Sequence, residues 1–245
     1  MQISLNWQPS VTASLIHAVA ALAAGRSLLH AAADAAWRKR ATRLAQQLAD
    51  LPIGSHAAWQ RLRTQAAHES RAAQLAAGTV GPESFPGREE RVQGIEYELE
   101  SILACGAELF PRLEAELELR SRPLREQWEA CGPGLFREAC RRLQITAPSL
   151  RATVLPVYPV LGGGGGLQGD GSGVWIEAVL TNPYPQLPEF VRLAWLLMRL
   201  VTHDQYAPAE VIPSVLMAAE EVEAACCDPL TLKLAHQAWL DPPPQ

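Results

Sequence analysis

The segment 188–201 is apolar at nearly every position and limits the possible folds more than any other part of the sequence. A helix of this composition has no polar face to present to water, so other elements must surround it. The segment has 14 residues and carries Glu189, Arg192 and Arg199, which makes it too short and too charged to span a bilayer. We therefore expect a buried helix at the centre of a globular core.

The N-terminal part of the chain has helical periodicity. Residues 10–50 are rich in Ala and Leu and predict one or two helices, with Ser10 or Thr12 as a candidate N-cap. A further helix is expected from Ser55 to Gly78, because glycine commonly follows a helix C-terminus.

The following segment, 88–143, predicts acidic helices that Pro111 should kink or divide. Further interruptions are expected at Pro123 and at Pro133, which stands between two glycines. The first 146 residues therefore predict an all-helical region.

The pattern changes after residue 146. Segments 152–161 and 174–180 are rich in β-branched and aromatic residues and predict two strands that form a hairpin across a glycine-rich loop. Pro156 and Pro159 cannot donate ladder hydrogen bonds, which favours an edge or bulged position for the first strand. Two more helices are expected around 209–225 and 229–240.

These elements predict a predominantly α-helical α+β fold. The helical region 1–146 contains basic helices in 10–77 and acidic helices in 88–143. The region 147–245 contains one β-hairpin packed with a buried helix and two covering helices. The sequence leaves open whether the two regions form a single domain.

Composition favours a folded, cytoplasmic chain. Charged residues make up 19% and apolar residues 48% of the sequence, which is typical of a globular protein. The five cysteines form no CxxC pair, which favours a reducing compartment. Residues 1–25 lack formal charge, but they have no basic n-region and contain several polar residues, so we expect neither a signal peptide nor a membrane anchor.

Motifs for cofactors and metals are missing from the sequence. The glycine-rich loop lacks the Lys-Ser/Thr pair of a phosphate-binding loop and leads into a strand, so it predicts a hairpin tip. His68 and Glu69 begin a pattern typical of zinc-binding helices, but Ala72 stands where the second histidine should be. We therefore predict no cofactor and no metal, with the six histidines in surface or core positions.

The order of a strand, a hairpin and a core helix is similar to that in zincin-type metallopeptidases. The helix 188–201 contains no histidine, so this likeness implies at most a degenerate, non-catalytic relative.

Four residues are weak catalytic candidates: Glu177, Glu189, Arg192 and His203. Glu177 stands in a predicted apolar strand, and burying its charge unpaired would be expensive. We expect Glu177 or Glu189 to pair with Arg192 and so to tie the hairpin to the core helix. The alternative is a carboxyl of raised pKa that serves as general acid or base in a hydrolase-like enzyme, with His203 recruited nearby.

A basic cluster forms a candidate interaction surface: Arg38, Lys39, Arg40, Arg43, Arg61 and Arg63. The chain carries a net charge of −5 and offers few aromatic residues near this cluster, so nucleic acid is not an expected partner. We expect the basic surface to face the acidic helix 88–118, within the fold or across an oligomer contact.

Three functions follow from these features. The first is a non-catalytic interaction or assembly protein that binds a protein partner or itself as a homo-oligomer, because helix faces and sheet edges are recurrent docking surfaces. The second is the hydrolase-like enzyme with a site around Glu177. The third is a weak polyanion binder.

Overall fold

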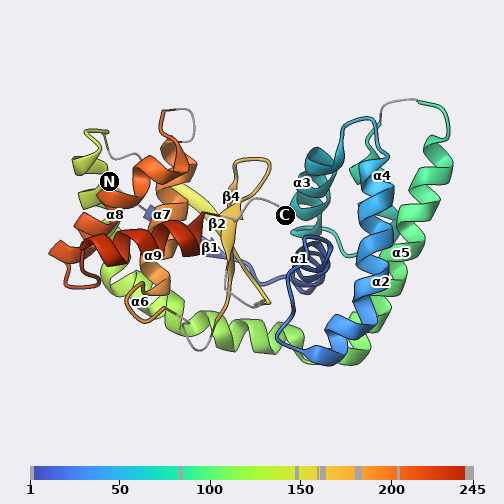
Figure 1. The fold of residues 1–245 in the computed structure, drawn as a ribbon, viewed down its shortest axis with the longest axis horizontal. Helices are drawn as coiled ribbons and strands as arrows, with labels where there is room; N and C mark the ends of the chain where they lie inside the picture. Colours follow the sequence, from blue (N-terminus) through green and yellow to red (C-terminus); the bar gives the residue numbers. More distant parts are fainter. Residues whose placement is uncertain are drawn as a thin grey trace.

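The computed structural model describes residues 3–82, 85–146, 149–158, 160, 164–179, 184–202 and 205–240. Within these residues the helices are α1 (Val11–Ala23), α2 (Ala31–Ala49), α3 (Ser55–Ala66), α4 (Ala72–Val80), α5 (Arg88–Leu109), α6 (Leu113–Arg142), α7 (Glu189–Thr202), α8 (Pro208–Glu221) and α9 (Pro229–Trp239). The strands are β1 (Ile3–Trp7), β2 (Leu150–Val157), β3 (Gly165–Leu167) and β4 (Gly173–Glu177). The predicted predominantly helical α+β class is confirmed (Figure 1).

Several predictions made from short sequence patterns are confirmed. The Ser10 side chain caps α1 by accepting a hydrogen bond from the backbone N–H of Ala13. Pro111 lies between α5 and α6 and divides the predicted acidic helix. The apolar segment 188–201 forms α7, whose residues from Phe190 to Met198 are all buried. None of the helices in the described part of the chain is both long and apolar enough to cross a membrane.

The predicted helix from Ser55 to Gly78 is two helices, α3 and α4, and Gly78 lies inside the second. A Cβ atom at Gly78 would overlap the terminal amide of Gln65, so this glycine lies against a side chain of α3 rather than ending a helix. The predicted interruptions at Pro123 and Pro133 are also wrong, because α6 continues through both prolines. Each proline removes one backbone donor, which a 30-residue helix packed along its length can tolerate.

The sheet has the strand order β1-β2-β4-β3. The predicted pairing of its two main strands is wrong, because β2 and β4 are parallel, and the antiparallel hairpin is formed by β3 and β4. The edge position predicted for Pro156 is also wrong, since β2 lies between β1 and β4. Pro159 lies outside the described residues.

Strand β2 tolerates Pro156 because of the alternation of its backbone groups. The N–H of Thr153 donates toward β4, whereas the carbonyl of Val154 accepts from Gln8 on the β1 side. Residue 156 shares the orientation of residue 154, and β1 has already ended at Trp7, opposite Val154. The nitrogen of Pro156 therefore faces no neighbouring strand.

Strand β1 (Ile3–Trp7) was not predicted from the sequence. Residues 3–7 alternate between partly buried and exposed side chains, which is the period expected for a half-buried strand. Ile3, Leu5 and Trp7 pack against the core that surrounds α7. The signal was present in the sequence, but the segment is short and directly precedes a strong helix.

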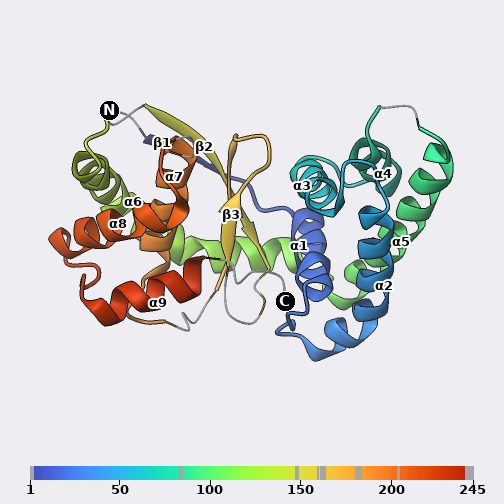
Figure 2. The same cartoon turned by 45° about the horizontal axis from the view of Figure 1, so that its top comes forward.

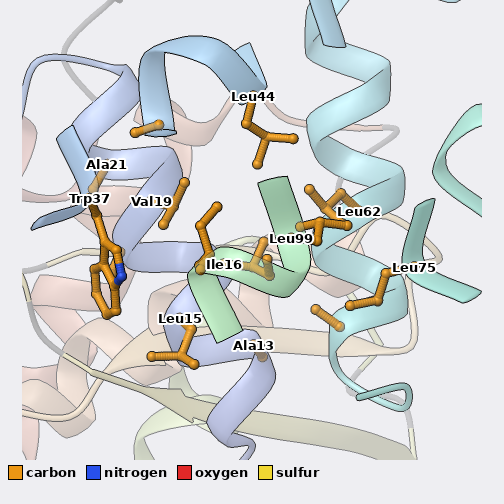
Figure 3. Packing of buried hydrophobic residues seen from close by; sticks show 14 of the residues in the cluster. Ala13, Leu15, Ile16, Val19, Ala21, Trp37, Leu44, Leu62, Leu75 and Leu99 are labelled. Atoms are coloured by element: carbon orange, nitrogen blue, oxygen red, sulfur yellow. The ribbon is translucent and has the colours of Figure 1, made fainter. Parts of the chain in front are cut away.

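Two hydrophobic cores lie on either side of the sheet (Figures 1 and 2). The first core belongs to the helical lobe, which we define as α1–α5, where Ile16, Trp37 and Leu99 pack together (Figure 3). The second belongs to the mixed lobe, which we define as the sheet with α7–α9, and it is centred on α7. Helix α6 contributes its first turns to the first core and the remainder to the second.

Two glycine substitutions test the close packing of the sheet. A Cβ atom at Gly173 would fall on the backbone of Thr153 in the neighbouring strand, whereas one at Gly134, inside α6, would meet nothing within 4 Å. We expect Gly173→Ala to lower the free energy of unfolding by about 2 kcal/mol or more. Gly134→Ala should raise it by up to about 1 kcal/mol through helix propensity. Urea denaturation of both variants measures the difference, and equal effects would contradict the described packing.

Candidate functional site

Glu177 is the last residue of β4, at the carboxyl end of this inner strand. Alternation along the strand directs Val174 and Ile176 into the second core, while Trp175 packs against the first. Glu177 shares the face of Trp175, and its side chain is completely shielded from solvent. The sequence therefore places a carboxylate at the boundary between the two lobes.

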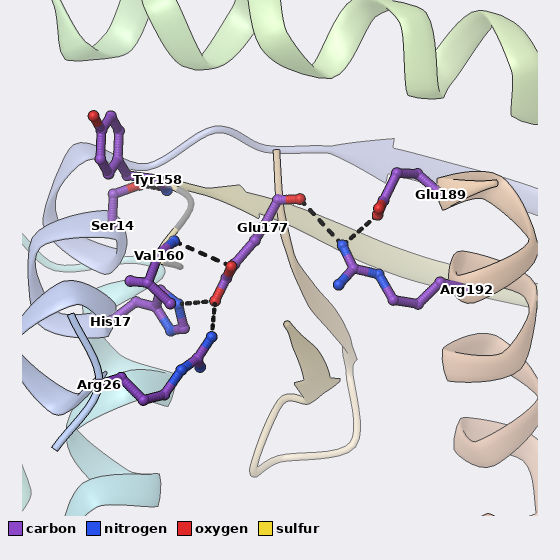
Figure 4. Close-up of polar contacts among 8 residues, drawn as sticks. All are labelled: Ser14, His17, Arg26, Tyr158, Val160, Glu177, Glu189 and Arg192. Carbon is purple, nitrogen blue, oxygen red and sulfur yellow. Dashed lines mark hydrogen bonds and ion pairs between the residues drawn. The ribbon is translucent and has the colours of Figure 1, made fainter. Parts of the chain in front are cut away.

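The carboxylate of Glu177 has partners from three separate segments (Figure 4). Its Oε1 atom lies 2.9 Å from Nε2 of His17 and 3.4 Å from the guanidinium of Arg26. Its Oε2 atom accepts a hydrogen bond of 3.1 Å from the backbone N–H of Val160. Donors therefore approach both carboxylate oxygens, which stabilises the charge in a buried setting.

Arg192 connects the same residue to α7. Its guanidinium contacts the carboxylate of Glu189 and donates a 3.3 Å hydrogen bond to the backbone carbonyl of Glu177. Arg192 thus pairs with Glu189, while the side chain of Glu177 faces α1 instead. Residue 177 is joined to α1 through its side chain and to α7 through its backbone (Figure 4).

Glu177 and Glu189 also line a cleft of about 280 Å³ beside α6, together with Arg120. Burial raises the pKa of Glu189, and the nearby charge of Glu177 adds to this effect, although Arg192 opposes it. A carboxyl of raised pKa next to a second carboxylate is an arrangement that can transfer a proton.

His17 is held as a neutral base. Loss of hydration on burial has the largest effect and lowers the pKa of His17 below its ordinary 6.5. The hydrogen bond and charge of Glu177 oppose this shift, whereas the positive charges of Arg63 and Arg26 add to it. A neutral ring that donates from Nε2 to Glu177 has its lone pair on Nδ1.

A second pocket, of about 370 Å³, is lined by His17 and by other residues of α1, α3 and the β3–β4 hairpin. Arg63 of α3 and Arg199 of α7 contribute positive charges, and Trp175 contributes an aromatic wall. The guanidinium carbon of Arg63 lies 5.7 Å from the centre of the Trp175 ring, and the ring centres of His17 and Trp175 are 4.7 Å apart. We call this cavity the interlobe pocket.

His17 and Gln168 line the interlobe pocket, and Nδ1 of His17 and Nε2 of Gln168 are buried atoms with no hydrogen-bond partner among the described residues. The amide oxygen of Gln168 accepts from Ser172, so its amide group is already oriented by one contact. Unsatisfied buried groups of this kind are uncommon and mark sites where water or a ligand binds.

The basic residues predicted as an interaction surface have different neighbours in the structure. Arg40 and Arg43 lie 3.5 Å and 3.7 Å from the buried carboxylate of Glu98 on α5. Arg38 pairs with Asp34 on its own helix, and Arg63 lines the interlobe pocket. Lys39 has no ion pair among the described residues, and Arg61 does not line the pocket. The catalytic candidate His203 lies outside the described residues.

Sequence reasoning missed His17 and Arg26 as partners of Glu177. The sequence offered one indication of a polar site: His17 is a titratable residue within a stretch of 25 residues without formal charge. Such a ring in a buried helix needs a polar partner, but the sequence gives no information on which one. Among the described residues, no three His, Cys, Asp or Glu side chains form a group that could hold a metal ion.

Comparison of the chain with protein-family models, curated proteins and solved structures finds no match. Function is therefore inferred from the chemistry of the two cavities and of the residues that line them.

The lowered pKa of His17 predicts a pH-dependent stability. In the window below pH 6.5 the unfolded chain binds a proton that the folded ring resists, so the free energy of unfolding falls as the pH is lowered. Between about pH 7.5 and about pH 5.5 we expect the free energy of unfolding of the wild-type protein to fall more than that of a His17→Gln variant. Glu189 acts in the opposite sense in both proteins, so its effect cancels in the difference.

Urea denaturation at both pH values measures this difference. His68→Gln is the matched control, because His68 is exposed and should leave the pH dependence unchanged. An identical pH dependence in the wild-type and His17→Gln proteins would contradict a neutral His17 in the folded state.

Proposed function

We propose that the chain is a non-catalytic binding protein whose ligand occupies the interlobe pocket. The observation that carries this proposal is the pocket itself, whose volume of about 370 Å³ lies within the usual range of small-molecule sites. It combines an aromatic wall with converging polar groups from both lobes, which is the composition expected of a ligand site.

The position of the pocket supports the proposal. Strands β1, β2 and β4 are parallel and end on the side of α1. In open sheets with parallel strands, ligands bind outside the carboxyl ends of the strands. Val157 is the last residue of β2 and lines the pocket, and Trp175, in the middle of β4, lines it as well.

The bonding of Glu177 supports a binding role over a catalytic one. A general acid or base must exchange protons with a substrate, but this carboxylate is fully buried and already has three partners. Its role in the proposal is to fix α1 and His17 against the sheet. The hydrolase-like alternative stays a hypothesis for the cleft lined by Glu177 and Glu189.

The other sequence hypotheses also stay predictions. Binding of a protein partner or self-association would use surfaces outside the interlobe pocket. Polyanion binding through the basic cluster receives less support, since Arg40 and Arg43 face the carboxylate of Glu98.

A pocket-filling substitution tests the proposal. Gln60 is an exposed residue of α3 that lines the pocket, and Gln46 is an exposed residue of α2 that does not. We expect native mass spectrometry to detect a bound small molecule on the wild-type chain after equilibration with the small-molecule fraction of its expression host. The Gln46→Trp variant should retain that added mass, whereas Gln60→Trp should lose it.

Two results would contradict the proposal. Added mass on the Gln60→Trp variant would place the ligand elsewhere, and a bare chain in all three samples would show that the pocket retains no small molecule from this mixture. A bare multimer would favour the assembly hypothesis instead.

A further inference from the structure

Two walls of the interlobe pocket come from different lobes. Gln168 and Gly169 line the pocket from the β3–β4 hairpin, and Gln60 and Thr64 line it from α3. The hairpin lies next to α3 in both views of the fold (Figures 1 and 2). A contact between the hairpin and α3 therefore closes one side of the pocket.

A hydrogen bond joins these two walls. The backbone N–H of Gly169 donates to Oγ1 of Thr64 over 3.1 Å. The Thr64 hydroxyl donates in turn to the backbone carbonyl of Gln60, one turn earlier in α3, over 2.9 Å. This second bond orients the hydroxyl and leaves its lone pairs for Gly169. We call the contact between Gly169 and Thr64 the latch. Because Gly169 is exposed and Thr64 is half-buried, the latch lies at the rim of the pocket.

The absence of a side chain at position 169 serves this contact. The φ angle of Gly169 is not in the left-handed region, so the backbone there does not itself require glycine. A Cβ atom would lie 2.8 Å from Oγ1 of Thr64 and 3.6 Å from Cβ of Gln60. A larger residue would therefore push the hairpin away from α3, and glycine permits the close approach that the latch needs.

The hairpin tip, which we define as residues 169–172, is exposed throughout. Among the described residues, its hydrogen bonds other than the latch stay within the mixed lobe, including one from the N–H of Gly171 to the carbonyl of Gln168. The base of the hairpin is packed on α7, since a Cβ atom at Gly165 would lie 2.7 Å from the side chain of Leu196. A packed base and an exposed tip are typical of a segment that opens locally.

The apolar end of the pocket is shielded from solvent. Leu155 and Val157 line the pocket, yet they are only 3% and 1% exposed. A molecule larger than water can reach these residues only after part of the wall moves. The latch is the contact at the rim whose loss would separate two of the walls.

We propose that the hairpin tip is a lid of the interlobe pocket and that the latch holds this lid closed. Breaking one hydrogen bond lets the tip move away from α3 and admits a ligand, and reforming the bond encloses the ligand. The proposal rests on the proposed binding function and adds the route by which the ligand enters.

Thiol labelling inside the pocket tests the lid without a ligand. Val157→Cys introduces a thiol into the shielded lining, and the native Cys140, 1% exposed in the second core, reports unfolding of the mixed lobe. Modification of both thiols by N-ethylmaleimide under native conditions is followed by peptide mass spectrometry. We expect the introduced thiol to react at least about tenfold faster than Cys140, because local opening requires less free energy than unfolding.

Three further substitutions, each combined with Val157→Cys, isolate the latch. Thr64→Val removes the acceptor, and Thr64→Ser retains it. Thr42→Val is the matched control, because Thr42 of α2 also donates to the carbonyl four residues earlier but does not line the pocket. Relative to Cys140, we expect Thr64→Val to speed labelling of the introduced thiol about fivefold, and the other two to leave it within about twofold. Circular dichroism establishes that all variants are folded.

Labelling of the introduced thiol no faster than that of Cys140 would overturn the lid. Equal effects of Thr64→Val and Thr42→Val would overturn the latch. Rapid labelling that depends on Thr64, together with a bare chain in native mass spectrometry, would support the lid and contradict the proposed function. The failure of this inference and that of the proposed function are therefore distinguishable.

Discussion

The buried carboxylate of Glu177 is the constraint on which the arrangement of the two lobes depends. A charge with no exposure to water is stable only when hydrogen-bond donors surround it. Here the donors are His17 and Arg26 from the helical lobe and the backbone of Val160, while Arg192 fixes the carbonyl of the same residue to α7. Satisfying one strand residue therefore requires α1, β4 and α7 to be in place together.

The interlobe pocket follows from this arrangement. Because Glu177 holds the Nε2 side of the His17 ring, the ring is fixed against Trp175, and Trp175 in turn supports Arg63. The polar groups of the pocket are thus positioned by contacts that exist without a ligand. Such preorganisation reduces the entropy lost on binding and favours a site over an accidental cavity.

The secondary-structure elements were more predictable from the sequence than the pairing of strands and of side chains. The helices, the apolar α7 and the unusual position of Glu177 follow from local periodicity and from the cost of burying charge. The parallel pairing of β2 with β4 and the partnership of Glu177 with His17, 160 residues away, depend on tertiary contacts. Arg192 and Glu189 are three residues apart on one helix, so their pairing was predictable, whereas the arrival of Arg63 and Arg199 in one pocket was not.

The contact between Glu177 and His17 is the central claim, and a double-mutant cycle tests it most directly. The free energy of unfolding would be measured by urea denaturation for the wild-type chain, His17→Gln, Glu177→Gln and the double variant. Each single substitution should cost about 2 kcal/mol or more, and the double variant should cost less than their sum by about 1–3 kcal/mol. Additive effects, within about 0.5 kcal/mol, would contradict a direct buried contact between these two side chains.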